Sequence, residues 1–355
     1  MDKRIRIALI FGGRSAEHDV SLISAAAVHN RLDKNAYSVS CLYITRDGLW
    51  KTVESPLKPE SSLSRGRGFP FLPWLSSKAG SAPAADIYFP ILHGPYGEDG
   101  TIQGLLEMAD VPYIGSGVLA SAAGMDKVVS KTLFKANGLP VGRYKVVDEI
   151  EWAVGKRPVL QDIQKDLALP YFVKPSNLGS SVGITKVKNP GKLRAALDLA
   201  FQYDRRVLVE EGIIGKEFEC SMLGNDRPRA SLPGEVIPHR EFYDYDDKYV
   251  NGKTTFIVPA KLPPSMVRRI MGLAVRAFKT VGAAGMARVD FLYEDRTKRL
   301  YLNEINTIPG FTAISMYPRL WEASGLSFSR LLDELVRLGF ERHRAKKRRV
   351  DRDAS

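Results

Sequence analysis

The sequence predicts a protein of mixed α/β and α+β class, with an open, mostly parallel sheet at its N-terminus and a strand-rich part after it. In the first third of the chain, short apolar runs alternate with helical patterns and glycine turns. Beyond Gly138 and Pro140, short strands follow one another with a single helix between them. A length of 355 residues allows two or three domains, and we expect the first to end near residue 118.

The N-terminal elements follow from apolar runs that end in turn residues. Residues 5–11 are apolar and lead into two glycines, which predicts a buried first strand. Residues 55–85 are rich in Ser, Pro, Gly and basic side chains without a period, which predicts a long surface excursion. The other elements expected here are a helix at 21–31, strands at 39–45, 86–92 and 111–114, and a helix at 101–109.

Capping and turn residues bound the later elements. Asp126 is predicted to cap a helix that ends near Asn137, because Gly138 and Pro140 stop it. The central part is expected to contain strands at 171–174, 182–187, 207–211 and 216–223, with one helix at 192–202. The last part is expected to contain a helix at 265–281, strands at 287–293 and 300–305, and a closing helix at 328–338.

Charge and composition narrow the class of partner. The chain has 52 Lys and Arg against 40 Asp and Glu, a net charge of +12, which first suggests a polyanion. The last fifteen residues hold seven basic and three acidic side chains, a net of +4, and are expected to form a frayed basic tail. We find neither basic residues interleaved with aromatics on one face nor a helix-turn-helix, so we expect no nucleic-acid partner. No apolar run approaches the ~20 residues of a membrane span.

The chain has only two cysteines, Cys41 and Cys220. Two cysteines in apolar strand contexts provide neither a disulfide framework nor a zinc site, so we expect inert core residues and a reducing cytoplasm.

The segment Gly115-Ser-Gly-Val-Leu-Ala120 satisfies the GxGxxA pattern of dinucleotide-binding sites. No acidic residue lies near position 140 for a ribose hydroxyl. A tight turn into a helix is therefore the favoured interpretation, and NAD-dependent chemistry remains an alternative.

The strongest chemical pattern is a strand pair at 287–293 and 299–306. With residues 294–298 as the hairpin turn, Asp290 is predicted to face Glu304, and Arg288 to face Asn306. Directly opposed β-carbons lie only ~4.5–5.5 Å apart, so the two carboxylates repel unless a cation lies between them. Carboxylate and amide oxygens suit Mg²⁺, although an exposed, solvated hairpin face is the alternative interpretation.

A glycine-rich loop follows Lys174, which stands at the end of a predicted strand. The small residues 179–183 leave backbone N–H groups able to surround a phosphate. The Walker spacing is absent, which excludes the P-loop class, and an ordinary flexible hairpin is the alternative. Lys127 is a second candidate phosphate ligand, although Lys127, Lys131 and Lys135 also fit an ordinary solvated helix stripe.

Seven segments, in this order, resemble the D-alanine–D-alanine ligase family of ATP-grasp enzymes. They are GGRSAEHDVS (12–21), LHGPYGEDGT (92–101), MDK (125–127), VKPSNLGSSVG (173–183), DYDDKY (244–249), GMARVD (285–290) and NEINTIPGFT (303–312). The resemblance spans residues 5 to about 340. It implies an N-terminal α/β domain at 1–118, then a two-domain ATP-grasp fold at 119–209 and 210–340 with ATP between its halves. The basic tail at 341–355 and the excursion at 55–85 lie outside the resemblance.

The resemblance also implies roles for single residues. Asp290, Glu304 and Asn306 would hold two Mg²⁺ ions, with Mn²⁺ as an alternative metal and Glu304 as the bridge. The nucleotide would be contacted at its phosphates by Lys127, Lys174 and Lys248, at the glycine-rich loop by Ser181, and at its adenosine by Glu210, Ile213 and Glu217.

On the substrate side, the resemblance assigns the first D-alanine's ammonium to Glu17 and the second one's carboxylate to Ser315. Arg288 and the Gly310 amide would stabilise the oxyanion, and His93 and Met316 would line the two subsites. Glu17, Ser180 and Tyr249 would form a triad that closes the loop of the 240s over an acyl phosphate.

The implied enzyme takes small-molecule substrates in the cytoplasm, as a homodimer without a membrane or nucleic-acid partner. A ligase that makes a D-alanyl ester or D-Ala–D-Ser is the alternative within this fold. Tyr249 matches the dipeptide-forming branch, whereas Met316 leaves the second subsite open.

Overall fold

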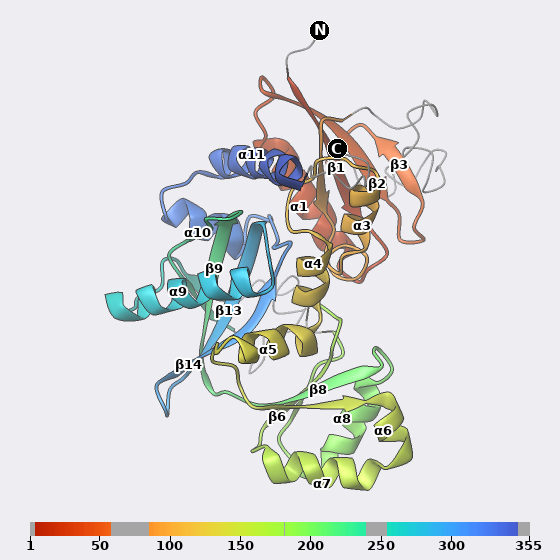
Figure 1. The fold of residues 1–355 in the computed structure, drawn as a ribbon, viewed down its shortest axis with the longest axis vertical. Helices are drawn as coiled ribbons and strands as arrows, with labels where there is room; N and C mark the ends of the chain where they lie inside the picture. The colour runs from red at the N-terminus through yellow and green to blue at the C-terminus, as the bar shows by residue number, and fades with distance from the viewer. Residues whose placement is uncertain (1–3, 58–84, 181, 239–253, 347–355) are drawn as a thin grey trace, which may run out of the picture.

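The structure is a computed structural model, and it describes residues 4–57, 85–180, 182–238 and 254–346. Three sheets follow one another along the chain, and the candidate site lies where segments from all three parts meet (Figure 1). Most of the surface excursion predicted at 55–85 lies outside the described residues. Within the described part, no helix is long and apolar enough to cross a membrane.

The N-terminal sheet has the order β3-β2-β1-β4, with β1 parallel to both neighbours and β3 antiparallel to β2. Its strands are β1 (Ile5–Gly12), β2 (Tyr37–Ile44), β3 (Trp50–Val53) and β4 (Ile87–Ile91). The predicted open, mostly parallel sheet is confirmed. The strand predicted at 111–114 is wrong, because only a single bridge joins Tyr113 to Tyr88 there.

Helices cover both faces of this sheet because alternate β1 side chains point to opposite sides. Ile7, Leu9 and Phe11 pack against α1 (His18–Arg31) and the distant α11 (Phe328–Lys346). Ala8 and Ile10 pack toward α3 (Thr101–Met108) on the other face. The last helix therefore completes the core of the first sheet, a contact that Figure 1 shows beside β1.

The central sheet has the order β5-β8-β6-β7 and is antiparallel. Its strands are β5 (Tyr144–Asp148), β6 (Tyr171–Pro175), β7 (Thr185–Val187) and β8 (Arg206–Glu211). The helices packed with it are α6 (Glu149–Val154), α7 (Lys156–Asp166) and α8 (Leu193–Ala200). The 3₁₀ turn η1 (Pro190–Lys192) precedes α8. The helix predicted at 192–202 is confirmed as α8, whereas α6 and α7, which precede the first predicted strand of this sheet, were not predicted. The boundary expected after residue 209 falls inside β8.

The third sheet has the order β12-β11-β9-β13-β14, with β10 beside β9. Its strands are β9 (Gly215–Gly224), β10 (Arg229–Ala230), β11 (Gly234–Ile237), β12 (Thr255–Ile257), β13 (Gly285–Glu294) and β14 (Arg299–Asn306). One face packs on α9 (Pro264–Thr280) and on α5 (Lys127–Ala136), which begins at Asp126 as predicted. Figure 1 shows α5 between this sheet and the central one.

The two cysteines and the GxGxxA segment behave as predicted. Cys41 and Cys220 are buried free thiols, and burial raises the pKa of each to about 12, so both are inert core residues. Gly115 turns the chain at a φ of +102°, and α4 (Val118–Met125) begins three residues later. The segment is a tight turn into a helix.

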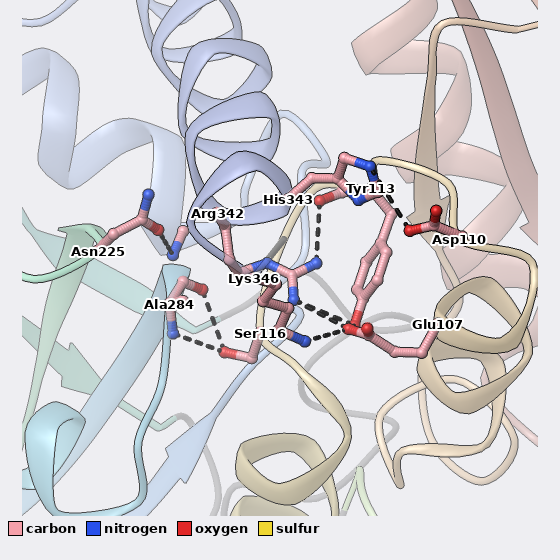
Figure 2. A network of polar contacts seen from close by, with 10 residues as sticks. Glu107, Asp110, Tyr113, Ser116, Asn225, Ala284, Arg342, His343 and Lys346 are labelled. Atoms are coloured by element: carbon pink, nitrogen blue, oxygen red, sulfur yellow. Dashed lines mark hydrogen bonds and ion pairs between the residues drawn. The ribbon is translucent and has the colours of Figure 1, made fainter. Parts of the chain in front are cut away.

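Helix α11 extends into the segment 341–355 that was predicted to be a frayed basic tail. The structure contradicts a frayed end for 341–346, because α11 continues to Lys346 and Arg342 is buried. The Arg342 guanidinium lies 3.9 Å from the centre of the Tyr113 ring and 3.2 Å from Glu107 Oε1, and Lys346 pairs with the same carboxylate (Figure 2). These contacts tie the end of the chain to the N-terminal part. Residues 347–355 lie outside the described part.

Candidate active site

A cleft lies at the meeting point of the N-terminal sheet, the glycine-rich loop and strand β14, and it spans about 990 Å³ when the open solvent at its mouth is included. It gathers polar side chains from segments that are far apart in the sequence. Its lining includes Glu17, His93, Glu98, Lys127, Gly179, Ser180, Glu219, Arg288, Glu304, Asn306, Gly310, Ser315 and Met316. Ten of the predicted site residues therefore line one cavity.

A row of carboxylates crosses three neighbouring strands, and two of its members, Glu219 and Glu304, line the cleft, whereas the buried Asp290 between them does not. Asp290 on β13 faces Glu304 on β14, and Arg288 faces Asn306, as the hairpin pattern predicted. On its other side Asp290 pairs with Glu219 on β9. Glu219 was missed because β9 and β13 are not joined by a hairpin, so their register cannot be counted from a turn.

Arg288 neutralises part of this row. Its guanidinium donates from Nε to one Asp290 oxygen at 2.8 Å and from the terminal nitrogen to the other at 2.6 Å, and Nε also lies 3.1 Å from Glu219 Oε2. Burial opposes a charge here, but Asp290 and Glu219 outweigh it and raise the pKa of Arg288 well above its usual range. The cation is held in a fixed orientation at the cleft.

The register of the hairpin depends on a β-bulge. Next to the turn Glu294 pairs with Arg299, and beyond an irregularity between Asp290 and Phe291 the ladder resumes with Asp290 opposite Glu304. Asn303 is the extra residue in this bulge. Bulges re-aim side chains and are frequent beside active sites, and this one aligns Glu304 with Asp290.

Glu17 stands at the start of α1 and meets the glycine-rich loop. Ser180 donates a hydrogen bond from Oγ to Glu17 Oε1, so this pair of the predicted triad is in place. A β-carbon at Gly179 would lie 2.6 Å from Glu17 Oε2, and one at Gly94 would lie 2.7 Å from the same oxygen. Glycine at both positions lets the carboxylate approach the loop. The third member, Tyr249, lies outside the described residues.

His93 is buried at the end of β4 and held as a neutral ring. Its Nδ1 lies 3.0 Å from the Ile308 carbonyl oxygen, and its Nε2 lies 3.3 Å from Ser24 Oγ, which also accepts the Phe311 N–H at 3.2 Å. This pattern assigns the proton to Nδ1, since a carbonyl only accepts. Burial lowers the pKa of His93 to about 4, against the Ile308 bond, with a further lowering from Arg288.

Glu98 is a second acid in the cleft that sequence reasoning did not single out. The Gly94 N–H donates to its Oε2 at 2.7 Å. Burial raises the pKa of Glu98 well above its ordinary value, and the negative charge of Glu17 raises it further. It lies within the segment LHGPYGEDGT, so the resemblance offered a signal for it.

The lysines of α5 do not form the solvated stripe that was the alternative interpretation. Lys127 and Lys131 are buried, whereas Lys135 is exposed. Lys127 donates from Nζ to the Leu178 carbonyl at 2.5 Å, and burial lowers its pKa. Only Lys127 lines the cleft itself.

Lys174 and Glu210 form a buried ion pair on neighbouring strands of the central sheet. Lys131 contacts the same carboxylate, with Nζ 2.7 Å from Glu210 Oε1. Burial alone would raise the pKa of Glu210, but Lys131 and Lys174 lower it to about 2. Burial likewise opposes the charge of Lys174, yet Glu210 and then Glu304 raise its pKa.

The turn after β14 brings Gly310 and Ser315 together. A β-carbon at Gly310 would lie 2.7 Å from Ser315 Oγ, which accepts the Thr312 N–H at 3.0 Å. Met316 begins α10 (Met316–Ala323), and its side chain is buried at the cleft.

The remaining predicted residues are placed as follows. Ile213 lies in the β8–β9 connection and Glu217 lies on β9, and neither lines the cleft, although the charge of Glu217 raises the pKa of Lys174. Lys248 and Ser181, like the segment DYDDKY, lie outside the described residues.

Magnesium suits the oxygen donors of the carboxylate row. Asp290, Glu304 and Asn306 offer only hard oxygen ligands on one face. Among the residues the structure describes, no three His, Cys, Asp or Glu side chains lie together as a group that could hold a metal ion. Mg²⁺ typically takes one or two carboxylates and completes its shell with substrate phosphates and water, so Asp290, Glu304 and the Asn306 amide are the candidate protein ligands.

Comparison with known proteins agrees with this arrangement. The family model described as the D-ala D-ala ligase N-terminus matches residues 6–116, and the one described as the D-ala D-ala ligase C-terminus matches residues 133–337. The chain belongs to the D-alanine–D-alanine ligase family. Members of this ligase family are ATP-dependent, ADP-forming enzymes of peptidoglycan synthesis, and they have the ATP-grasp fold.

Individual ligases are similar over nearly their whole length. The D-alanine–D-alanine ligase of Thermoanaerobacter sp. (strain X514) is 49% identical over 98% of this chain and 99% of its own. The structure of the ligase from Coxiella burnetii has a TM-score of 0.84 at 37% identity, covering 97% of this chain and 96% of that one. The VanG D-Ala:D-Ser ligase of Enterococcus faecalis also has a TM-score of 0.84, at 36% identity, covering 95% and 99%.

Proposed function

We propose that this cleft joins two D-alanines at the expense of ATP, through an acyl phosphate of the first. The observation that carries the proposal is the convergence of Glu17, Arg288, Glu304, Gly310 and Ser315 on one cavity. In this cavity Glu17 can hold an ammonium group, Arg288 can hold a negatively charged oxygen, and Glu304 belongs to the carboxylate row that would hold metal. These groups suit two amino acids and a phosphate. A carboxylate is a poor acyl donor, so its activation by ATP is the chemistry that such a site requires.

In the proposed reaction, a carboxylate oxygen of the first D-alanine attacks the γ-phosphorus of ATP, and ADP leaves. The amine of the second D-alanine then attacks the carbonyl carbon, and inorganic phosphate leaves with one of the original carboxylate oxygens. The ammonium of the second D-alanine must lose a proton before it can attack and a second one as the amide forms. Negative charge builds on the carbonyl oxygen during the attack. Arg288 and the Gly310 amide stabilise that oxygen electrostatically.

The first D-alanine's ammonium is assigned to Glu17, whose carboxylate is already oriented by Ser180. The second one's carboxylate is assigned to Ser315, and His93 and Met316 line the subsites. Acyl phosphates hydrolyse readily, so water must be excluded during the reaction. We assign that task to the 240s loop with Tyr249, as the third member of the Glu17–Ser180 triad.

For the nucleotide, we assign the phosphates to Lys127, Lys174, Lys248 and the Ser181 loop, and the adenosine to Glu210, Ile213 and Glu217. Asp290, Glu304 and Asn306 would hold two Mg²⁺ ions, or Mn²⁺, which would neutralise phosphate charge as phosphoryl transfer proceeds. ATP would then lie between the halves 119–209 and 210–340. We further propose a cytoplasmic homodimer, which light scattering after size-exclusion chromatography tests.

The test is phosphate release from ATP with D-alanine as first substrate and D-alanine, L-alanine, D-serine or D-lactate as the second. The proposal expects release and dipeptide formation with D-alanine and little with L-alanine. Preference for D-serine would instead favour the activity named for the Enterococcus faecalis relative. If no phosphate is released with any of the four second substrates, the proposal is overturned.

A further inference from the structure

Lys131 is buried beside the cleft but is not among its lining residues. Its side chain is 3% exposed, and an ammonium is stable at such a site only when its donors are satisfied. Nζ lies 2.7 Å from Glu210 Oε1 and donates to the Asn303 carbonyl oxygen at 2.9 Å. Both contacts go to groups that flank the proposed nucleotide and metal positions.

These two partners belong to different sheets. Glu210 lies on β8 of the central sheet, and Asn303 lies on β14 of the third sheet. Helix α5, which carries Lys131, lies between the two sheets (Figure 1). A single buried ammonium therefore joins the two surfaces between which ATP is proposed to lie.

The partner on β14 is the bulged residue itself. Asn303 precedes Glu304, and the bulge between Asp290 and Phe291 sets which β14 residue faces Asp290. A bulge leaves a residue out of the strand ladder, so its carbonyl needs another donor. Lys131 supplies that donor, and it thereby fixes the strand position from which the Glu304 carboxylate projects.

The partner on β8 is an acid with two cations. Glu210 contacts Lys174 through one oxygen and Lys131 through the other. Without Lys131, Lys174 would remain as the described cation paired with Glu210, and the buried carboxylate would turn toward it. Lys174 would then be drawn away from the phosphates that it is proposed to contact.

We propose that Lys131 is a positioning residue for nucleotide binding, which holds Glu210 for the adenosine and the Asn303 bulge for Glu304. This inference rests on the proposed role of Glu210 in ATP binding. It assigns Lys131 no contact with substrate, so its effect passes through Glu210 and the bulge.

The variant Lys131→Met removes the charge at similar length, and Lys135→Met is the matched control one turn further along α5, where the side chain is exposed. Losing a hydrogen bond to a charged group weakens binding by about 10- to 100-fold. We expect Lys131→Met to raise the dissociation constant for ADP, measured by calorimetry, and the KM for ATP by this factor. The KM for D-alanine should change less than threefold, and Lys135→Met should match the unchanged enzyme.

A purely structural role predicts a different pattern, because it lowers the fraction of folded enzyme and hence kcat without altering the affinity for ADP. Lys131→Arg keeps the charge and should bind ADP within about threefold of the unchanged enzyme. If Lys131→Met does not fold, Lys131→Arg is the variant that decides. A 10-fold loss of ADP affinity in Lys131→Arg would contradict the proposal. Unchanged ADP affinity in Lys131→Met would also overturn it.

A double-mutant cycle separates action through Glu210 from any other effect. Lys131→Met combined with Glu210→Gln should lose less ADP affinity than the sum of the two single losses, because only the contact with the Asn303 bulge is left to remove, and fully additive losses would overturn the inference. Calorimetry with ADP needs no amino-acid substrate. If the enzyme binds ADP but releases no phosphate with D-alanine, the proposed reaction fails. The ADP affinities of the variants still decide whether Lys131 is a positioning residue.

Discussion

The neutral state of His93 makes the stability of this enzyme sensitive to mild acid. The ring is buried, and its two nitrogens are committed to the Ile308 carbonyl and the Ser24 hydroxyl. Protonation would place a charge in this buried site and turn Nε2 from an acceptor into a donor. The Ser24 hydroxyl would then have to accept from Nε2 as well as from the Phe311 N–H, and its own O–H would lose Nε2 as an acceptor.

The magnitude follows from the pKa of His93, which is about 4 in the folded enzyme against an ordinary 6.5. Each pKa unit is worth about 1.4 kcal/mol, so the folded state gains about 3 kcal/mol from this group at neutral pH. Because the folded pKa is depressed, the contribution is present above pH 6.5 and is lost as the pH falls toward 4. About 3 kcal/mol should have disappeared at pH 4.

The assay is urea unfolding followed by tryptophan fluorescence at several pH values between 7 and 4.5. His93→Gln removes the titrating group, so its free energy of unfolding should fall less steeply with decreasing pH than that of the unchanged enzyme. His29→Gln, at a partly exposed histidine of α1, is the control and should keep most of the steep dependence. Parallel curves for the unchanged enzyme and His93→Gln would refute this reasoning.

Three further predictions concern the cleft and the last helix. Gly179→Ala places a methyl group 2.6 Å from Glu17 Oε2 and should raise the KM for the first D-alanine about 10-fold or more, and by a larger factor than the KM for ATP. Unchanged kinetics would contradict the assigned role of Glu17. Glu304→Ala should lower phosphate release by about 10²-fold or more at an unchanged melting temperature, and near-normal turnover would reject the metal assignment. Arg342→Met should lower the free energy of unfolding by about 2 kcal/mol with unaltered kcat, because it removes the buried contacts with Glu107 and Tyr113; a change in urea midpoint no larger than experimental error would contradict this.

The candidate site could be predicted furthest where its residues are close in sequence. The Asp290–Glu304 register follows from counting across one hairpin turn, and it is confirmed. The turn beside it does not follow the same count, because the bulge at Asn303 moves the ladder by one residue. A local sequence pattern does not reveal a bulge, because the displaced carbonyl group needs a hydrogen-bond donor from elsewhere in the chain. Here that donor is Lys131.

Contacts between distant segments could not be predicted in this way. Lys131 and Lys135 look alike in the helical pattern, and burial separates them only because α5 lies between two sheets. Likewise, α11 continues to Lys346 because Glu107 and Tyr113, more than two hundred residues earlier, receive its basic side chains. The charge pattern of that segment alone favours a solvated end.

The missed helices have a local cause. Gly155 separates α6 from α7, so each is too short for a clear helical period. Pro158 suggests a break, yet it stands in the first turn of α7, where its missing N–H group costs nothing. Helices of this length are stabilised by packing on the sheet, and Trp152 and Ile163 supply those contacts.

The central claim is the acyl phosphate, and oxygen transfer tests it most directly. D-alanine labelled with ¹⁸O in both carboxylate oxygens is incubated with ATP and the enzyme, and the released phosphate is analysed by mass spectrometry. The account predicts one ¹⁸O atom in each phosphate formed with the dipeptide, because the carboxylate oxygen that attacks phosphorus leaves with it. Unlabelled phosphate released in step with dipeptide formation would contradict the account.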